Sequence, residues 1–146
     1  MDLERLFEFA GNHLYLVIIF FVITVLLVKD LLESLLRKYE VVTPLQAVML
    51  VNQEDAEVVD VREPAEWAKG HIISAKLISL GDLEKRLDEL KEHKQKPVIV
   101  TCQSGTRSPA ACKKLIQEGF ARVYMLKGGM TAWTDAGLPV TKPKKN

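Results

Sequence analysis

Residues 98–120 read VIVTCQSGTRSPAACKKLIQEGF, and this stretch decides the fold. Residues 98–101 are apolar and rich in β-branched side chains, which is typical of a central parallel strand covered on both faces. Pro109 near the start and Gly119 as a stop predict a helix after the loop. Strand, loop and helix in this order predict an α/β domain, with Cys102 at the carboxyl end of the strand, where open sheets of this class bind ligands.

The flanking sequence continues the alternation of strands and helices. Thr43, Pro44 and Gln46 supply an N-cap, a first-turn proline and a capping-box glutamine, so a helix is expected to run to about residue 51. The other expected elements are a strand at 58–61, a helical turn at 64–67, a strand at 75–78, a helix at 83–92, a strand at 122–126 and a helix at 130–137. The pattern predicts a mainly parallel sheet flanked by helices over residues 41–141, without internal repeats.

Residues 1–28 form a separate N-terminal segment with a predicted transmembrane helix. The strictly apolar run is LYLVIIFFVITVLLV at 14–28, and weaker apolar character extends back to Phe9. A helix over 9–28 is about 30 Å long, enough to cross a bilayer core. A buried core helix is the alternative, but a domain of about 100 residues has no interior able to surround it. A cleaved signal peptide is disfavoured by the acidic N-terminus and the absence of an A-x-A-like site.

The two flanks of this helix indicate its orientation. Arg5 alone precedes it, whereas Lys29, Arg37 and Lys38 follow it, so the positive-inside rule predicts a single-pass protein with its C-terminal domain in the cytoplasm. Residues 29–40 carry an apolar stripe that ends at Tyr39, and this amphipathic linker helix either lies along the lipid headgroups or continues the transmembrane helix and packs on the soluble domain. Residues 142–146 form a basic tail, interpreted as a solvated terminus.

Overall composition excludes several classes of function. The chain has 146 residues, and 20 basic and 19 acidic side chains give a formal net charge of +1, so nothing indicates a nucleic-acid partner. There are two cysteines, Cys102 and Cys112, and they form no disulfide framework, in agreement with a cytoplasmic domain. No spacing of His, Cys or carboxylates is typical of a metal site, and no cofactor is expected.

Cys102 is the candidate nucleophile. The loop that follows it, Gln103, Ser104, Gly105 and Thr106, is small and polar, so its N–H groups can point inward and form an anion cradle. These groups, the helix N-terminus and Arg107 are expected to lower the pKa of the thiol and to bind an anionic substrate. Cys102 as an inert buried hydrophobe is the alternative, which the position beside Gly105 and Arg107 disfavours. For Cys112, inside the following helix, structural burial is favoured over a resolving thiol.

Three blocks of sequence resemble the signature blocks of single-domain rhodaneses: VVDVREPAEWAKGHI, VIVTCQSGTRS and VYMLKGGMTAWTDAGLPV. The resemblance implies a rhodanese-like fold and a sulfurtransferase in which the loop cysteine, Cys102, takes a sulfane sulfur from a donor such as thiosulfate. The cysteine then passes it, as a persulfide, to a thiophilic acceptor. It also implies that Arg107 binds the anionic donor, and that Asp60 and Arg62 support the loop and balance its charge.

Other residues in the matching blocks are interpreted as structural. Trp133 is expected to pack, Gly128 and Gly129 match the family's turn before the last helix, and His71 is expected to form hydrogen bonds rather than to act as a base. The chain departs from the family at Ser74 and Lys76, where a glycine and then an asparagine or isoleucine are common. This departure leaves the expected fold intact but bears on substrate access from that side.

Two rival functions remain open. A cysteine phosphatase or arsenate reductase also pairs a cysteine with an arginine, but the resembling phosphatases have five residues between them, whereas this loop has four. The shorter loop suits a persulfide sulfur better than a phosphoryl group. The second rival is a noncatalytic, membrane-tethered docking module on the same scaffold, which the intact Cys102 and complete loop argue against.

The membrane anchor itself predicts contact with lipid and a membrane-bound protein partner, brought close by a shared surface.

Overall fold

The computed structural model describes residues 13–143 and divides the chain into two compact units between Arg37 and Lys38. The first unit contains helix α2 (Leu14–Leu36), which follows His13 and ends where Arg37 adopts an extended backbone. Its stretch Leu14–Leu32 is long and apolar enough to cross a membrane, and none of that stretch is buried within the structure. Length and composition of this kind are shared by membrane spans and signal sequences.

The linker expected at residues 29–40 is not a separate helix. Helix α2 runs through Lys29 to Leu36 without a break, as expected if the apolar helix continues, and the packing of this segment on the second unit stays a prediction. Tyr39 does not belong to the apolar stripe, because it follows the helix and is buried in the core of the second unit. Residues 9–12 of the expected span, Arg5 and residues 144–146 of the expected tail lie outside the described residues.

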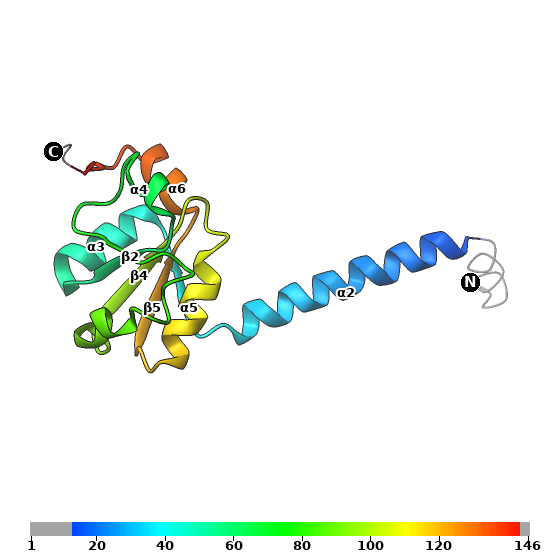
Figure 1. Cartoon of the computed structure of the whole chain (residues 1–146). Coiled ribbons are helices and arrows are strands. Elements are labelled where there is room, and N and C mark those ends of the chain that lie inside the picture. Colours follow the sequence, from blue (N-terminus) through cyan, green and yellow to red (C-terminus); the bar gives the residue numbers. More distant parts are fainter. Residues whose placement is uncertain (1–12, 144–146) are drawn as a thin grey trace. The chain divides into compact units, whose positions relative to one another are not determined.

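The second unit is built on a five-stranded parallel sheet (Figure 1). Its strands lie in the order β1-β5-β4-β2-β3, and β4 pairs with β2 on one side and β5 on the other. The strands are β1 (Glu40–Val42), β2 (Glu57–Asp60), β3 (Lys76–Leu77), β4 (Pro97–Thr101) and β5 (Arg122–Leu126). All five residues of β4 are buried, as its apolar β-branched sequence predicts for a central strand.

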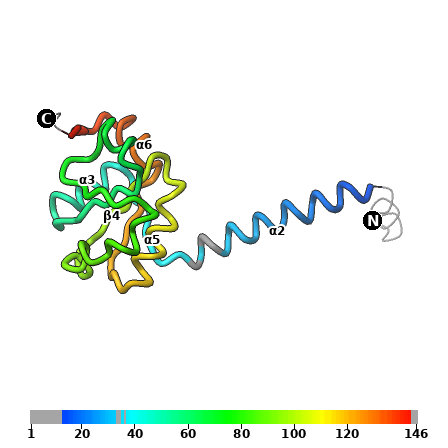
Figure 2. Tube along the Cα trace, viewed as in Figure 1, coloured from blue at the N-terminus to red at the C-terminus, as the bar shows by residue number. Residues whose placement is uncertain are grey.

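Helices cover both faces of this sheet, and Figure 2 follows the chain from β4 through α5 back to β5. The helices are α3 (Pro44–Glu54), α4 (Pro64–Trp67), α5 (Ser108–Gln117) and α6 (Gly129–Asp135). Ile99 packs with residues of α3 and α6, while its neighbours Val98 and Val100 pack on the opposite face with residues of α5. The alternating side chains of a strand therefore fill two separate cores. The predicted capping box of Thr43 and Gln46 begins α3.

One local prediction is corrected, and one strand was missed. Residues 83–92 form turns followed by a 3₁₀ helix at Leu87–His93 instead of an α-helix. Lys76 Nζ donates to the backbone carbonyl oxygen of Glu89 in this segment, and Arg86 Nη1 donates from the segment to the carbonyl oxygen of Leu77 in β3. Leu83 and Leu90 are still buried in the core, although the segment is not an α-helix. The strand β1 was not predicted, because it has only three residues and lies at the sheet edge.

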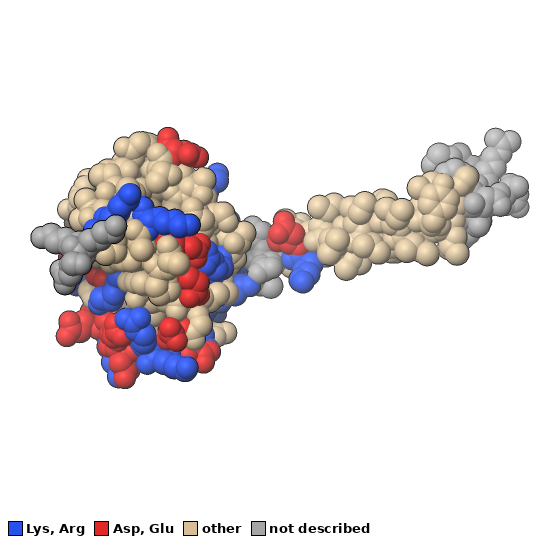
Figure 3. Space-filling view, turned by 45° about the horizontal axis from the view of Figure 1, so that its top comes forward, with Lys and Arg blue, Asp and Glu red and all other residues tan. Residues whose placement is uncertain are grey.

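Charge is distributed differently on the two units. Over the face of the globular unit shown in Figure 3, Lys and Arg mingle with Asp and Glu, while residues 14–28 of α2 present no charged side chain. Mixed charge of this kind gives no broad basic surface for nucleic acid on that face.

Candidate active site

The loop after β4 carries Cys102 to the carboxyl edge of the sheet. Residues 102–107 link β4 to α5, and the N-terminus of α6 holds this loop from the other side. The backbone N–H of Met130 donates to the carbonyl oxygen of Cys102 at 2.8 Å, and that of Thr131 donates to the carbonyl oxygen of Gln103 at 3.0 Å. Two backbone carbonyls of the reactive loop are thereby fixed in place, which leaves its N–H groups free to face inward.

Gly129 makes this close approach possible. Its φ of +58° lies in the left-handed region, and a Cβ atom added there would lie 2.3 Å from the carbonyl oxygen of Cys102. Real Cβ atoms do not approach that closely, so a side chain at Gly129 would push the loop away. Gly129 of the glycine pair therefore allows α6 to pack against the reactive loop.

The environment of the Cys102 sulfur favours the thiolate. The N–H of Gly105 donates to Sγ at 3.1 Å, and Ser108 Oγ is buried without a fixed hydrogen-bond partner among the described residues, so its hydroxyl is available to the sulfur. Burial by itself raises the pKa of this thiol. The Ser108 hydroxyl and three backbone N–H groups, of Arg107, Ser108 and Gly105, outweigh burial, so the pKa lies below the ordinary value.

The second cysteine is buried as fully as Cys102, but its polar neighbours differ. Cys112 lies in α5 with no exposed surface, and its thiol faces the carbonyl oxygen of Tyr124 at 3.8 Å. Burial, with a smaller contribution from the charge of Cys102, raises the pKa of Cys112 to about 12. A thiol of this kind is protonated at neutral pH and therefore a poor nucleophile.

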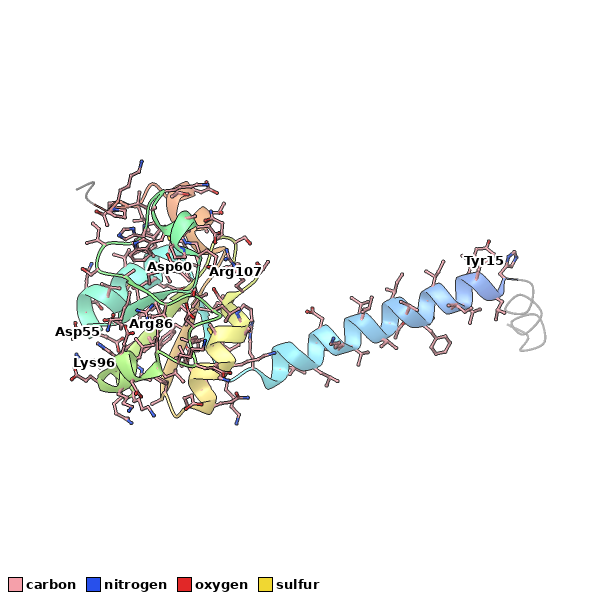
Figure 4. All side chains as sticks on the ribbon, viewed as in Figure 1. Tyr15, Asp55, Asp60, Arg86, Lys96 and Arg107 are labelled. Carbon is pink, nitrogen blue, oxygen red and sulfur yellow. The ribbon has the colours of Figure 1, made fainter. Side chains whose placement is uncertain are left out.

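Asp60 and Arg62 form a buried ion pair under the loop. Arg62 Nη2 lies 2.7 Å from Asp60 Oδ2, and both side chains are almost fully buried. Arg62 Nη1 also donates to Gln103 Oε1 at 3.0 Å, which ties the residue after the nucleophile to the end of β2. Figure 4 labels Asp60 and Arg107 toward the carboxyl ends of the strands, away from Asp55 and Lys96 at the amino ends. These contacts join the pair to the loop, and a supporting role for Asp60 and Arg62 stays a prediction.

Arg107 does not point freely into the loop. Its two terminal nitrogens donate to the two carboxylate oxygens of Glu66 in α4, at 2.8 and 2.7 Å. The hydrogen bond from Arg107, stronger than the opposing effect of desolvation, lowers the pKa of Glu66 to about 2. Arg107 therefore enters the site in two ways: its backbone N–H faces the sulfur, and its guanidinium group is held by a carboxylate from another segment.

A cavity of about 360 Å³ opens beside the loop. It is lined by Arg62, Glu66, Lys69 and Gly70, by Gln103, and by Met130, Thr134 and Val140. Ser104 and Thr106 lie on the outer side of the loop with exposed side chains, 3.4 Å apart between their hydroxyl oxygens. Of the residues expected to bind substrate, Gly105 contacts the sulfur directly, while Gln103 lines the cavity and Arg107 pairs with Glu66.

The residues interpreted as structural have structural contacts. Trp133 is buried and its Nε1 donates to the carbonyl oxygen of Pro139. His71 stacks on Trp67 with ring centroids 3.5 Å apart, and its Nδ1 lies 3.1 Å from the carbonyl oxygen of Trp67. Ser74 has a φ of +64°, the left-handed backbone that explains why the family commonly has glycine at this place. Among residues 13–143, no group of three or more His, Cys, Asp or Glu is arranged to hold a metal ion.

Three contributors to the site were missed by sequence reasoning: Ser108, Glu66 and the spacing function of Gly129. Ser108 had a weak signal, because it follows the loop arginine at the start of a helix. Glu66 had none, since it is 41 residues from Arg107 and only the fold brings the two together.

The family model, the similar sequences and the similar solved structures agree with one another. Residues 43–136 match the model of the rhodanese-like domain. The uncharacterized protein YibN of Escherichia coli is 35% identical over 97% of this chain and its own full length. A sulfurtransferase of Allochromatium vinosum is 40% identical over 65% of this chain and 87% of its own, and the thiosulfate sulfurtransferase GlpE of Coxiella burnetii is 33% identical over 74% and 98%. A rhodanese-related protein from Thermoplasma volcanium is similar in structure, with a TM-score of 0.65 and 28% identity over 72% of this chain and all of that chain.

Proposed function

Because this chain belongs to the rhodanese-like domain family, we propose that it is a membrane-anchored sulfurtransferase that carries sulfane sulfur as a persulfide on Cys102. At the level of the family, sulfur transfer is supported by relatives named sulfurtransferase. The finer statements, which concern the nucleophile, the donor and the membrane, are argued from the residues of this chain.

The proposed reaction has two steps at one sulfur atom. The Cys102 thiolate attacks the sulfane sulfur of a donor such as thiosulfate, a new S–S bond forms to Sγ, and sulfite leaves with the electron pair of the broken S–S bond. A thiophilic acceptor, cyanide in an assay or a thiol, then attacks the outer sulfur. The S–S bond to Sγ breaks, and the thiolate of Cys102 is restored. Both steps need an anionic sulfur at the same place, and the inward N–H groups stabilise it there.

The observation that carries the proposal is the Gly105 N–H directed at Cys102 Sγ at 3.1 Å, together with a thiol whose pKa is held below the ordinary value. An inert buried cysteine would have the raised pKa of Cys112 instead. The loop also has four residues between Cys102 and Arg107, one fewer than the phosphatase loop, so the cradle suits a single sulfur atom better than a phosphoryl group.

Membrane anchoring is proposed from helix α2. The stretch Leu14–Leu32 exposes its apolar side chains on all sides, with Phe20 66% and Leu27 65% exposed, and a lipid environment removes this surface from water. Lys29 at the C-terminal side of the apolar run, with Arg37 and Lys38 beyond it, favours a cytoplasmic catalytic domain. Contact with lipid and with a membrane-bound acceptor or donor protein follows from this placement.

Sulfur transfer from thiosulfate to cyanide tests the function. We expect transfer by the wild-type chain and by Cys112→Ser, and none by Cys102→Ser, which deletes the nucleophile but keeps a similar shape. Transfer by Cys102→Ser would contradict the mechanism. Steady hydrolysis of a phosphate ester without sulfur transfer would favour the phosphatase, and neither activity in a folded protein would favour the docking module.

A further inference from the structure

The charges beside the reactive loop are balanced in pairs. Arg107 is held by both oxygens of Glu66, and Arg62 is held by Asp60, so each of the two guanidinium groups nearest the loop has its own carboxylate. The two guanidinium groups that could bind a small dianion at the loop are therefore already neutralised, and Lys69 is a further cation that lines the cavity beside it. This differs from the expectation that Arg107 is free to bind the donor.

Glu66 is well placed to keep Arg107 in this position. It belongs to the short helix α4, and its Oε2 accepts a hydrogen bond from the backbone N–H of Glu63 at 3.1 Å, which orients the carboxylate. With a pKa lowered to about 2, chiefly by the hydrogen bond from Arg107, this group stays ionised in any neutral buffer. A bidentate pair of this geometry also fixes the direction of the guanidinium plane.

The Arg107 charge lies within electrostatic reach of the sulfur. The Glu66 hydrogen bonds are the main reason that the pKa of Arg107 is raised, and the charge of Cys102 contributes in the same direction. Glu66 also lines the cavity beside the loop, so its carboxylate faces a substrate that enters there. Its charge therefore bears both on the potential at the thiolate and on the entry of anions.

We propose that Glu66 is a positioning residue that holds and neutralises Arg107, and so sets how strongly the reactive loop attracts anions. This inference rests on the proposed function and refines its substrate class. Small dianions such as thiosulfate are disfavoured at the wild-type loop. The preferred donor carries at most one negative charge, as the anion of an organic or protein-bound persulfide does.

The test compares two reagents that differ in charge. The full chain is alkylated at Cys102 with iodoacetate, an anion, and with iodoacetamide, which is neutral, and the rates are read by mass mapping of the Cys102 peptide. The ratio of the two rates reports the local potential at the sulfur and cancels differences in thiolate content. For Glu66→Gln we expect this ratio to rise roughly three- to tenfold, because the charge that neutralises Arg107 is removed.

Glu54→Gln is the matched control. Glu54 also pairs with an arginine, Arg122, and its loss changes the net charge by the same amount, but Arg122 lies at the amino end of β5, away from the loop. Its ratio should stay at the wild-type value. Glu66→Asp, which keeps the charge, should restore most of the wild-type ratio. Should Glu66→Gln fail to fold, Arg107→Ala provides the reciprocal measurement: it leaves the carboxylate uncompensated, so the ratio should fall below the wild-type value.

An unchanged ratio in folded Glu66→Gln, or in folded Arg107→Ala, would overturn the inference. The outcome is separable from the proposed function, since alkylation needs no sulfur transfer. In a wild-type chain that transfers sulfur, Glu66→Gln should in addition lower the KM for thiosulfate with little change in kcat, and an unchanged KM would count against the proposal. A merely structural Glu66 would alter both reagents equally.

Discussion

At the scale of single residues, the two cysteines differ in what surrounds their sulfur atoms. Cys102 faces the Gly105 N–H and the Ser108 hydroxyl, and its pKa is lowered, whereas burial raises the pKa of Cys112 to about 12. We therefore expect iodoacetamide at neutral pH to modify Cys102 and leave Cys112 untouched. Because the thiolate reacts, the rate at Cys102 should rise with pH to a plateau whose midpoint lies below that of the same cysteine in urea-unfolded chain.

The lowered pKa of Cys102 also makes the stability of the fold depend on pH. A thiol whose folded pKa is depressed stabilises the fold fully above the unfolded pKa, and this contribution is lost as pH falls through the folded pKa. A pH–rate midpoint at or above that of the unfolded chain, or equal labelling of Cys112, would contradict the described environment of the two thiols.

Single residues also show how far sequence reasoning reaches. Cys102 and Gly105 could be assigned from the loop pattern alone, because both act through local backbone geometry. The pairing of Arg107 with Glu66 could not be predicted, since only the fold brings α4 close to the loop. Ion pairs between distant segments leave no periodic signal in the sequence.

At the scale of elements, the reactive loop depends on the N-terminus of α6. Gly129→Ala places a Cβ against the Cys102 carbonyl oxygen and should lower the free energy of unfolding by about 2–4 kcal/mol, through overpacking and backbone strain. Gly137→Ala is the control, because Gly137 also has a positive φ, +69°, but open space around it, and should cost about 1 kcal/mol. Urea unfolding of both variants measures the difference, and equal losses would contradict the contact.

Elements with strong local signals were predicted and those set by distant contacts were not. The capped helix α3, the apolar strand β4 and helix α5 follow from caps, β-branched runs and stop residues. The edge strand β1 was missed because it exists only through pairing with β5. The α-helix expected at 83–92 was replaced by turns and a 3₁₀ helix, and this segment is joined to β3 by the hydrogen bonds of Lys76 and Arg86, which are contacts between segments distant in the sequence.

At the scale of the whole molecule, the division between Arg37 and Lys38 separates a candidate membrane span from the globular unit. We expect the full chain to remain in membranes through carbonate extraction, and residues 38–146 alone to be soluble with the same rate of persulfide formation. Val22→Arg, which places a charge in the middle of the span, should weaken retention by about 3 kcal/mol. A soluble mature protein that lacks the N-terminal helix would instead identify that helix as a cleaved signal.

The central claim is that Cys102 accepts one sulfur atom, and intact-mass analysis after exposure to a sulfane-sulfur donor, either an organic persulfide or excess thiosulfate, tests it most directly. The account predicts a mass increase of one sulfur atom in the wild-type chain and in Cys112→Ser. The added sulfur should map to the Cys102 peptide, be removed by cyanide, and be absent from Cys102→Ser. If thiosulfate and organic persulfides both leave the wild-type mass unchanged, or if the added sulfur maps to Cys112, the account is contradicted.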